Sequence, residues 1–333
     1  MRLPNPLGDV VMTTPLLAVL RAAMPRTRIV AAGADVFGPL LAGCTDLDEF
    51  LPLPAASRSG AGAIGRQAGL LRRADADTAL VLPNSWSSAA AVRRAGVARR
   101  IGRGGFWRGL LLTDRLPPIP GPAPMTELYA DFLAPLPVPR PRQLPPARLV
   151  ARDPLPEPLA SAGPGPWLGV APGAAFGPSK KYPQAELLEA VTAAARAHGL
   201  TPVWIGAPGE SLDLALLAKH AADRLGCPPL VVCGDLGAAK SALAACRVLL
   251  AMDNGARHVA AALGVPQAVV YGPTHPAWSA HARERTVIVR NESLGCLACH
   301  HKVCPLRGHP CMRELPPTAV AEAVGRALAL GTR

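Results

Sequence analysis

Eleven prolines lie between positions 135 and 166 and divide the chain into two halves. Proline lacks a backbone N–H and fixes φ, so this stretch cannot form a long helix or a central strand. On either side, short apolar runs alternate with segments of helical periodicity. The alternation predicts two α/β lobes, over residues 1–134 and 167–333, joined by a Pro-rich linker over residues 135–166.

Each half is expected to form a parallel sheet with helical crossovers. Two doubly wound lobes of this kind bind ligands at the carboxyl ends of their strands, which predicts a cleft between them. The expected strands are residues 28–32, 49–53, 78–82, 110–113, 167–171, 202–205, 230–233, 248–252 and 268–271. The main expected helices are residues 14–24, 64–73, 85–94, 184–198 and 319–329.

The chain carries 35 Lys and Arg against 23 Asp and Glu, a net charge of +12. This charge favours phosphates or an anionic membrane surface as partners. No basic arm or recognition motif points to nucleic acid, which is not an expected partner. The densest basic cluster is either a solvated face or a docking surface for a phosphorylated acceptor or lipid headgroups; it comprises Arg93, Arg94, Arg99, Arg100, Arg103 and Arg108.

No apolar stretch approaches the ~20 residues that cross a bilayer, and the N-terminus has no signal-peptide pattern. The sequence therefore predicts a cytoplasmic protein, at most peripheral to a membrane.

Two loops in the second half suit a bound anion. Residues 171–183 follow an apolar run, are rich in Gly and Pro, and contain Lys180 and Lys181. Backbone amides and an ammonium are what a diphosphate requires, although an ordinary loop with solvated lysines has the same sequence pattern. Residues 251–258 also follow an apolar run and open a helix, where free amides attract phosphate.

Individual residues of these loops have structural alternatives. Asp253 is also suited to cap the helix, and His258 is either a buried helix histidine or a donor to the same phosphate. In the first half, Gly8 allows close approach of a ligand, and Asp9 is either a general base or a residue that stabilises the next helix.

Taken in order along the chain, these segments resemble the ADP-heptose–lipopolysaccharide heptosyltransferases, glycosyltransferase family 9, and most of all their type II members. The resemblance covers nearly the full length and rests on residues 2–12, 83–85, 172–180, 253–262 and 271–274. It implies a GT-B fold of two Rossmann-like lobes. It also implies inverting transfer of heptose from ADP-L-glycero-β-D-manno-heptose to the lipopolysaccharide inner core, with no metal at the catalytic centre.

The resemblance also assigns roles. Asp9 matches the base that deprotonates the acceptor, with Gly8 and Asn84 on the acceptor side. Lys180 matches the lysine that neutralises the leaving diphosphate. The remaining donor-side positions are Glu210, Leu236, Asp253, Asn254, Gly255 and His258. The implied partners are ADP-heptose, a Kdo–lipid A-type phosphorylated glycolipid and, peripherally, the inner membrane.

The sequence departs from the family pattern at its start. Relatives have an apolar strand before the Arg-Leu-Pro-Asn stretch, whereas this chain begins at Met1-Arg2. We therefore expect the first strand of the N-terminal lobe to be missing, and a form extended upstream to be more stable. Arg257, unusual beside His258, is expected to add phosphate affinity.

A segment over residues 296–311 holds Cys296, Cys299, Cys304 and Cys311, with His300 and His301 between them. Four thiolates suit a structural zinc site. The spacing is not that of common zinc knuckles, so a reduced or cross-linked loop is an equal alternative.

Three other functions remain to be compared with heptosyl transfer. A transferase for another nucleotide sugar or acceptor fits the same motifs. A catalytically silent nucleotide-sugar-binding protein fits if the first lobe lacks its strand. A basic nucleic-acid-binding protein accounts for the charge alone.

Overall fold

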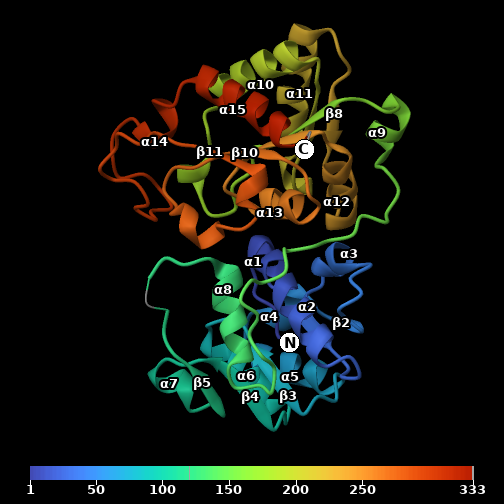
Figure 1. The fold of residues 1–333 in the computed structure, drawn as a ribbon, viewed down its shortest axis with the longest axis vertical. Helices are drawn as coiled ribbons and strands as arrows, with labels where there is room; N and C mark the ends of the chain where they lie inside the picture. The colour runs from blue at the N-terminus through green and yellow to red at the C-terminus, as the bar shows by residue number, and fades with distance from the viewer. Residues whose placement is uncertain (120, 332–333) are drawn as a thin grey trace. The chain divides into compact units, whose positions relative to one another are not determined.

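The computed structural model describes residues 1–119 and 121–331. The chain divides into two compact units, Met1–Leu149 and Val150–Arg333, shown in Figure 1. The division falls inside the Pro-rich stretch, parts of which pack into each unit: Val138 and Leu149 are buried in the first, and Leu159 in the second. Leu159 belongs to α9 (Glu157–Ala162), a short helix with proline in its first turn.

The first unit is built on parallel strands. β1 (Val30–Ala34) pairs with β2 (Glu49–Leu53), and β4 (Arg99–Arg103) pairs with β3 (Thr78–Val81) and β5 (Asp114–Leu116).

Residues 1–3 join these two sets of strands. Arg2 forms parallel bridges to Ala32 of β1 and Val81 of β3. Its N–H donates to Leu80 O at 2.8 Å, and the N–H of Leu3 donates to Ala32 O at 2.8 Å. Residues 1–3 thus lie between β1 and β3 and pair with both through isolated bridges, and Leu3 is fully buried, but they form no strand of their own, as the prediction of a missing first strand expected.

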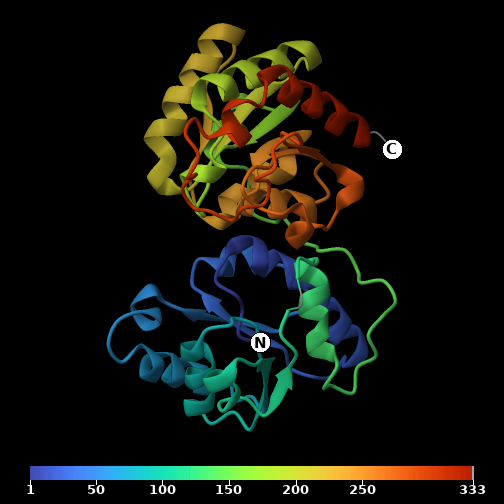
Figure 2. The same ribbon diagram turned by 90° about the vertical axis from the view of Figure 1, so that its left-hand side faces the viewer.

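Helices of the first unit surround this sheet. Their bounds are α1 (Leu7–Met12), α2 (Thr14–Ala23), α3 (Phe37–Leu41), α4 (Ala55–Arg58), α5 (Ala63–Arg72), α6 (Trp86–Arg94), α7 (Phe106–Gly109) and α8 (Met125–Ala130). A 3-10 turn, η1 (Asp131–Leu133), continues α8. Helices α1 and α2 pack against α8, which Figure 2 shows as blue helices beside a green one.

Two strands of the first unit differ from the prediction. Residues 110–113 were expected to form a strand, which was wrong: the N–H groups of Leu111 and Leu112 donate to Arg108 O and Gly109 O in turns. The strand is β5, which begins at Asp114. Strand β4 was not predicted, because its sequence is rich in arginine.

Two arginines of the basic cluster, Arg103 and Arg108, are buried and bind backbone carbonyls. Arg108 is 5% exposed, and its Nη2 donates to Pro83 O at 2.7 Å. Arg103 is 8% exposed and donates to the carbonyl oxygens of Pro117 and Leu128 at 2.7 and 2.8 Å. Arg99 pairs with Asp114 at 2.8 Å. Arg103 and Arg108 are therefore buried and not part of a solvated face, whereas Arg99 is partly exposed and Arg93 and Arg94 are exposed.

The second unit contains a six-stranded parallel sheet in the order β11-β10-β9-β6-β7-β8. The strands are β6 (Trp167–Ala171), β7 (Thr201–Ile205), β8 (Leu230–Val232), β9 (Val248–Met252), β10 (Gln267–Val270) and β11 (Thr286–Val289). The first five were predicted to within about two residues, because strands buried on both faces are continuous apolar runs. Strand β11 was not predicted.

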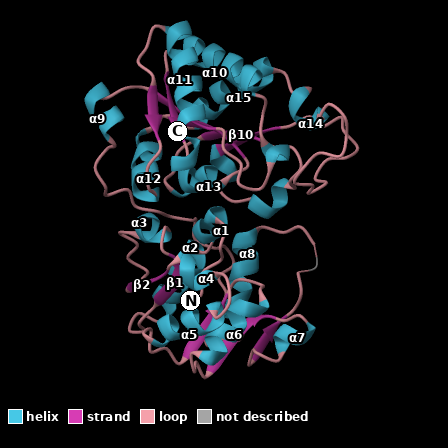
Figure 3. Cartoon of the chain, turned by 180° about the vertical axis from the view of Figure 1, so that it is seen from behind, coloured by secondary structure: helices cyan, strands magenta, loops and turns pink. Residues whose placement is uncertain are grey.

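Helices cover both faces of this sheet, as Figures 1 and 3 show. On one face pack α10 (Gln184–His198), α11 (Ser211–Leu225) and α15 (Pro317–Leu330); on the other lie α12 (Leu236–Ala245) and α13 (Gly255–Ala262). The remaining elements are α14 (Pro310–Arg313) and the 3-10 turns η2 (Pro178–Lys180), η3 (Pro208–Glu210), η4 (Pro276–Ser279) and η5 (Arg283–Arg285).

Candidate functional site

The loops that follow β6 and β9 meet at one edge of the second unit's sheet. The two strands are paired in parallel, with Ala171 opposite Ala251, so their carboxyl ends lie side by side. Asn254 connects the two loops: its Nδ2 donates to Ala171 O at 2.9 Å and to Gly173 O at 2.8 Å. Its Oδ1 accepts from the N–H of Arg257 at 3.3 Å and caps α13, which begins at Gly255. The cap is thus Asn254, and the alternative that made Asp253 the cap was wrong.

Lys180 lies against the same helix start. Its Nζ is 2.6 Å from Asp253 Oδ2 and donates to Asp253 O at 2.8 Å. The side chains of both residues are 11% exposed. The ring of Phe176 lies 5.0 Å from the ammonium. The fold therefore brings together the two residues that the sequence placed 73 positions apart.

Two further side chains contact the carboxylate of Asp253. Its Oδ2 accepts from Thr274 Oγ1 at 2.6 Å, and its Oδ1 lies 3.7 Å from Arg257 Nε. Burial alone would raise the pKa of Asp253, but the charges of Lys180 and Arg257, with the hydrogen bonds from Lys180 and Thr274, hold it below its ordinary value.

Two cations and one carboxylate leave this cluster with one net positive charge. The charge lies at the N-terminus of α13, where the backbone N–H groups also favour an anion. This arrangement can bind a phosphate group.

Arg257 does not present its charge to solvent. It is 1% exposed, and its Nη2 donates to Ser279 O at 2.5 Å. Its guanidinium contacts Asp253 and Ser279, so any phosphate affinity that Arg257 adds comes from its buried charge and not from direct contact.

His258 is a buried partner of a second histidine. It is 5% exposed, its Nδ1 lies 2.7 Å from His281 Nε2, and the rings are stacked at 5.0 Å. Burial, with the nearby charge of Arg257, lowers the pKa of His258 well below its ordinary value and that of His281 to about 3. The pair is neutral, so His258 does not bring a positive charge to an anion at neutral pH.

Glu210 and Leu236 lie on the loops after β7 and β8. Glu210 ends η3, and its Oε2 accepts from Ala207 N at 2.9 Å. A Cβ placed on Gly173 would lie 2.6 Å from Glu210 Oε1, so the carboxylate lies against the loop that follows β6. Leu236 begins α12 and is partly buried. Because β8 is two strands from β6, Leu236 stands further along the same edge of the sheet.

In the first unit, Asp9 lies within α1, in its first turn, and is partly buried. It lines a cavity of about 230 Å³ together with Asn84, while Gly8 is buried beside it. Burial and the charge of Asp9 raise the pKa of Tyr129, another residue of the wall. The cavity combines polar and apolar walls: Pro4, Asn5, Pro6, Asp9, Leu82, Pro83, Asn84, Ser85, Arg103, Ile119, Met125, Leu128, Tyr129 and Phe132.

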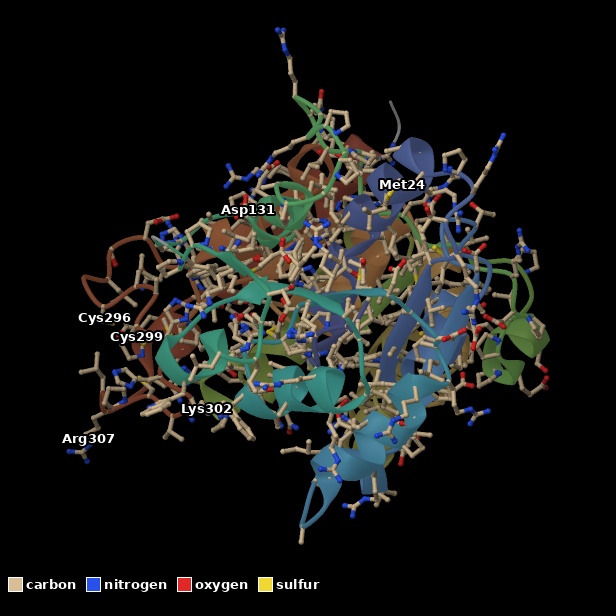
Figure 4. All side chains as sticks on the ribbon, turned by 90° about the horizontal axis from the view of Figure 1, so that it is seen from below. Met24, Asp131, Cys296, Cys299, Lys302 and Arg307 are labelled. Carbon is tan, nitrogen blue, oxygen red and sulfur yellow. The ribbon has the colours of Figure 1, made fainter. Side chains whose placement is uncertain are left out.

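The cysteine segment forms an exposed loop, on which Figure 4 labels Cys296 and Cys299. All four cysteines are free thiols; Cys296 and Cys299 are exposed, and Cys311 is buried. Within residues 1–119 and 121–331, no three His, Cys, Asp or Glu side chains are grouped so as to hold a metal ion. No helix of this described part is long and apolar enough to cross a bilayer.

Several site residues were missed from the sequence. Thr274 belonged to a quoted motif but had no assigned role, and His281, Ser279 and Tyr129 carried no signal. Each acts through a contact that only the folded chain creates.

Solved structures share this two-unit architecture. The structure of the Escherichia coli ADP-heptose lipopolysaccharide heptosyltransferase II matches with a TM-score of 0.77 and 23% identity, over 100% of this chain and 98% of that one. E. coli heptosyltransferase WaaC with ADP-2-deoxy-2-fluoro heptose matches with a TM-score of 0.72 and 18% identity, over 98% and 99%. The fold is therefore GT-B, the architecture of a large class of glycosyltransferases.

The sequence comparisons identify the family within that class. The model of glycosyltransferase family 9 (heptosyltransferase) matches residues 64–309. Lipopolysaccharide heptosyltransferase 2 of Escherichia coli (strain K12) is 29% identical over 270 residues, which are 76% of each chain. This chain belongs to glycosyltransferase family 9.

Proposed function

We propose that this chain transfers heptose from ADP-L-glycero-β-D-manno-heptose to the inner core of lipopolysaccharide, with inversion at the anomeric carbon, as a heptosyltransferase II. The observation that carries the proposal is the placement of Lys180 at the N-terminus of α13, within a cluster of net positive charge, in a family 9 chain. A relative with 29% identity is named lipopolysaccharide heptosyltransferase 2. The E. coli protein with a TM-score of 0.72 was solved with an ADP-heptose analogue.

On the donor side, the diphosphate accepts hydrogen bonds from the N–H groups at the start of α13, around Gly255, and pairs with the ammonium of Lys180. Glu210 and Leu236 stand on the loops that would receive the nucleoside. Asp253 and Asn254 belong to the same donor-binding loop, where their side chains also bind Lys180, Thr274 and two carbonyls and so hold the lysine and the loop in place. His258 supports the same helix as a neutral group.

On the acceptor side, the carboxylate of Asp9 removes the proton from an acceptor hydroxyl in the cavity of the first unit, flanked by Gly8 and Asn84. The freed oxygen attacks the anomeric carbon, and the bond from that carbon to the β-phosphate oxygen breaks. ADP leaves with the electron pair, and its charge is met by Lys180 and the helix amides. The base and the leaving-group cation thus come from different units.

The acceptor is proposed to be a Kdo–lipid A-type phosphorylated glycolipid, reached by peripheral contact with the cytoplasmic face of the inner membrane. The net charge of +12 supports attraction to anionic headgroups. No metal is proposed for the transfer, since Lys180 and the amides supply the positive charge. Zinc is not assigned to the cysteine segment, whose described thiols form no group of metal-ligating side chains.

One assay tests the proposal. The protein is incubated with ADP-heptose and a heptose-primed Kdo–lipid A acceptor, and ADP release is followed. Wild type is expected to turn over. Asp9→Ala is expected to lose about 10²–10⁴-fold in kcat while still binding ADP, which is the usual effect of removing a general base. Lys180→Ala is expected to lose donor affinity as well.

Two outcomes would contradict it. Full activity in Asp9→Ala removes the proposed base. A wild type that binds ADP-heptose without turnover on any glycolipid acceptor indicates a silent nucleotide-sugar-binding protein instead.

A further inference from the structure

The segment that carries the clustered cysteines, residues 296–311, contacts the loop that carries Lys180. We propose that this segment positions Lys180 for the donor's diphosphate, with Ser179 and His309 as positioning residues that do not themselves touch the donor. The inference rests on the proposed function of Lys180. It gives the cysteine segment a role in donor binding that needs no metal.

The loop carrying Lys180 has little regular structure of its own. It consists of a three-residue turn, η2, preceded by Gly177. Gly177 has φ 153° and ψ 170°, which residues with a side chain rarely adopt. A Cβ on Gly177 would lie 2.5 Å from Lys302 O, so the two segments are in direct backbone contact. Figure 4 labels Lys302 on the same loop as the exposed cysteines.

Ser179, next to Lys180, is bonded to this segment through every polar group it has. Its N–H donates to Lys302 O at 3.2 Å, and its Oγ donates to His301 O at 2.6 Å. Its carbonyl oxygen lies 2.9 Å from His309 Nε2. Since a carbonyl can only accept, His309 carries a proton on Nε2. Ser179 itself is buried, 3% exposed, while His301 and Lys302, whose carbonyl oxygens accept two of these bonds, are exposed residues.

The same segment also holds the other side of the lysine. The N–H of His300 donates to Pro273 O at 2.8 Å, directly before Thr274, which donates to Asp253 Oδ2 at 2.6 Å. At its far end the segment is anchored by Cys311 and Met312, which belong to the apolar core of the unit. Residues 300–309 therefore contact the loop that carries Lys180 and the loop after β10, whose Thr274 binds Asp253.

Backbone strain marks this contact. His300 and His309 have φ of 56° and 50°, and Ala298 has φ of 61°. Residues with side chains keep such conformations only where surrounding contacts determine them, often beside functional sites. Two of these three residues make the hydrogen bonds described above.

A lysine side chain has several rotatable bonds, and ordering it upon binding costs conformational entropy. A loop fixed in advance lowers that cost, so the segment should act on donor affinity. Because the segment acts by holding Lys180, its contribution to ADP affinity should disappear when Lys180 is removed.

The test is binding of ADP and of adenosine to the full chain by calorimetry. Ser179→Ala and His309→Ala are expected to weaken ADP binding about five- to tenfold, the effect of one hydrogen bond. Gly177→Ala should weaken it further. Adenosine, which has no phosphates, should bind all variants equally.

His309→Gln retains a donor at Nε2 and should restore much of the ADP affinity. Val303→Ala, on the same segment with Val303 68% exposed, is the matched control and should behave like wild type.

A double-mutant cycle separates positioning from general destabilisation. In a Lys180→Ala background, His309→Ala should cause no further loss of ADP affinity. An equal loss in both backgrounds overturns the inference, as does wild-type ADP affinity in Ser179→Ala, His309→Ala and Gly177→Ala. If His309→Ala does not fold, shown by thermal unfolding, the Ser179→Ala cycle decides in its place. Failure of wild type to bind ADP at all counts against the proposed function instead.

Discussion

His258 Nδ1 and His281 Nε2 lie 2.7 Å apart, and the two stacked imidazoles form a buried neutral pair beside the cluster of Lys180, Asp253 and Arg257. A pair of this kind makes the stability of the second unit depend on pH. In the native state both pKa values are lowered, His281's to about 3, whereas an unfolded histidine titrates near 6.5.

The unfolded chain therefore binds protons below pH ~6.5 that the native state does not, and stability falls as the pH falls. The slope is up to about 1.4 kcal/mol per pH unit for each histidine. We expect the free energy of unfolding in urea to drop between pH 7.5 and 5.5, and His281→Gln to reduce that drop. His220→Gln, on the exposed face of α11, is the control. An unchanged pH dependence in His281→Gln would contradict the assignment of a neutral pair.

Asn254 offers a test of the loop geometry. Asn254→Ala removes the cap of α13 and both bonds to the loop after β6, and should lower the free energy of unfolding by about 2–3 kcal/mol. Asn254→Asp keeps the capping oxygen but places a carboxylate against two carbonyls. It should therefore also be destabilised and should bind ADP more weakly. Chemical unfolding and calorimetry measure both effects. If Asn254→Asp matched wild type, the amide donors would be unimportant.

Arg108 tests whether the arginine cluster is structural. Arg108→Met should lower the free energy of unfolding by about 2–4 kcal/mol, because it leaves buried carbonyls of Val81 and Pro83 without a donor. Arg94→Met, at an exposed position on α6, should change it by less than about 0.5 kcal/mol. Urea unfolding monitored by circular dichroism measures the difference. Equal effects of the two substitutions on the free energy of unfolding would contradict a structural role for Arg108.

Chelation tests the charge compensation proposed for the leaving group. Because Lys180 and the helix amides supply the positive charge, we expect EDTA to leave kcat unchanged and added Mg²⁺ not to raise it. The ADP-release assay measures this directly. A loss of activity in EDTA that Mg²⁺ reverses would assign the leaving-group charge to a metal.

Sequence patterns predicted most of the second unit. Strands such as β6 and β9 are continuous apolar runs, and the residues directly after adjacent parallel strands must meet. The meeting of the loops after β6 and β9 follows from that rule, whereas the ion pair between Lys180 and Asp253 was not predicted. The cap was assigned one residue too early because Asp253 and Asn254 are both good capping residues.

The first unit was predicted less well, and for a physical reason. Arg99–Arg103 is a strand whose arginines bind carbonyls and carboxylates within the unit. Because the strand is polar, the pattern of apolar runs does not predict it. Residues 110–113 are apolar yet form turns, because the strand that completes the sheet starts at Asp114. The roles of His281 and Ser179 depend on partners 23 and more than 120 residues away, which no local pattern reveals.

The two amide bonds from Asn254 to the loop after β6 also bear on how the chain is made. Together with the contacts of Ser179, they build one site from residues near 173–180, 253–258 and 300–309. Contacts so distant in sequence form only after the central strands have paired, which is slow for parallel topologies. During synthesis, residues up to about 309 must emerge from the ribosome before a nucleotide can bind. ADP should therefore stabilise only the finished unit, not its folding intermediates.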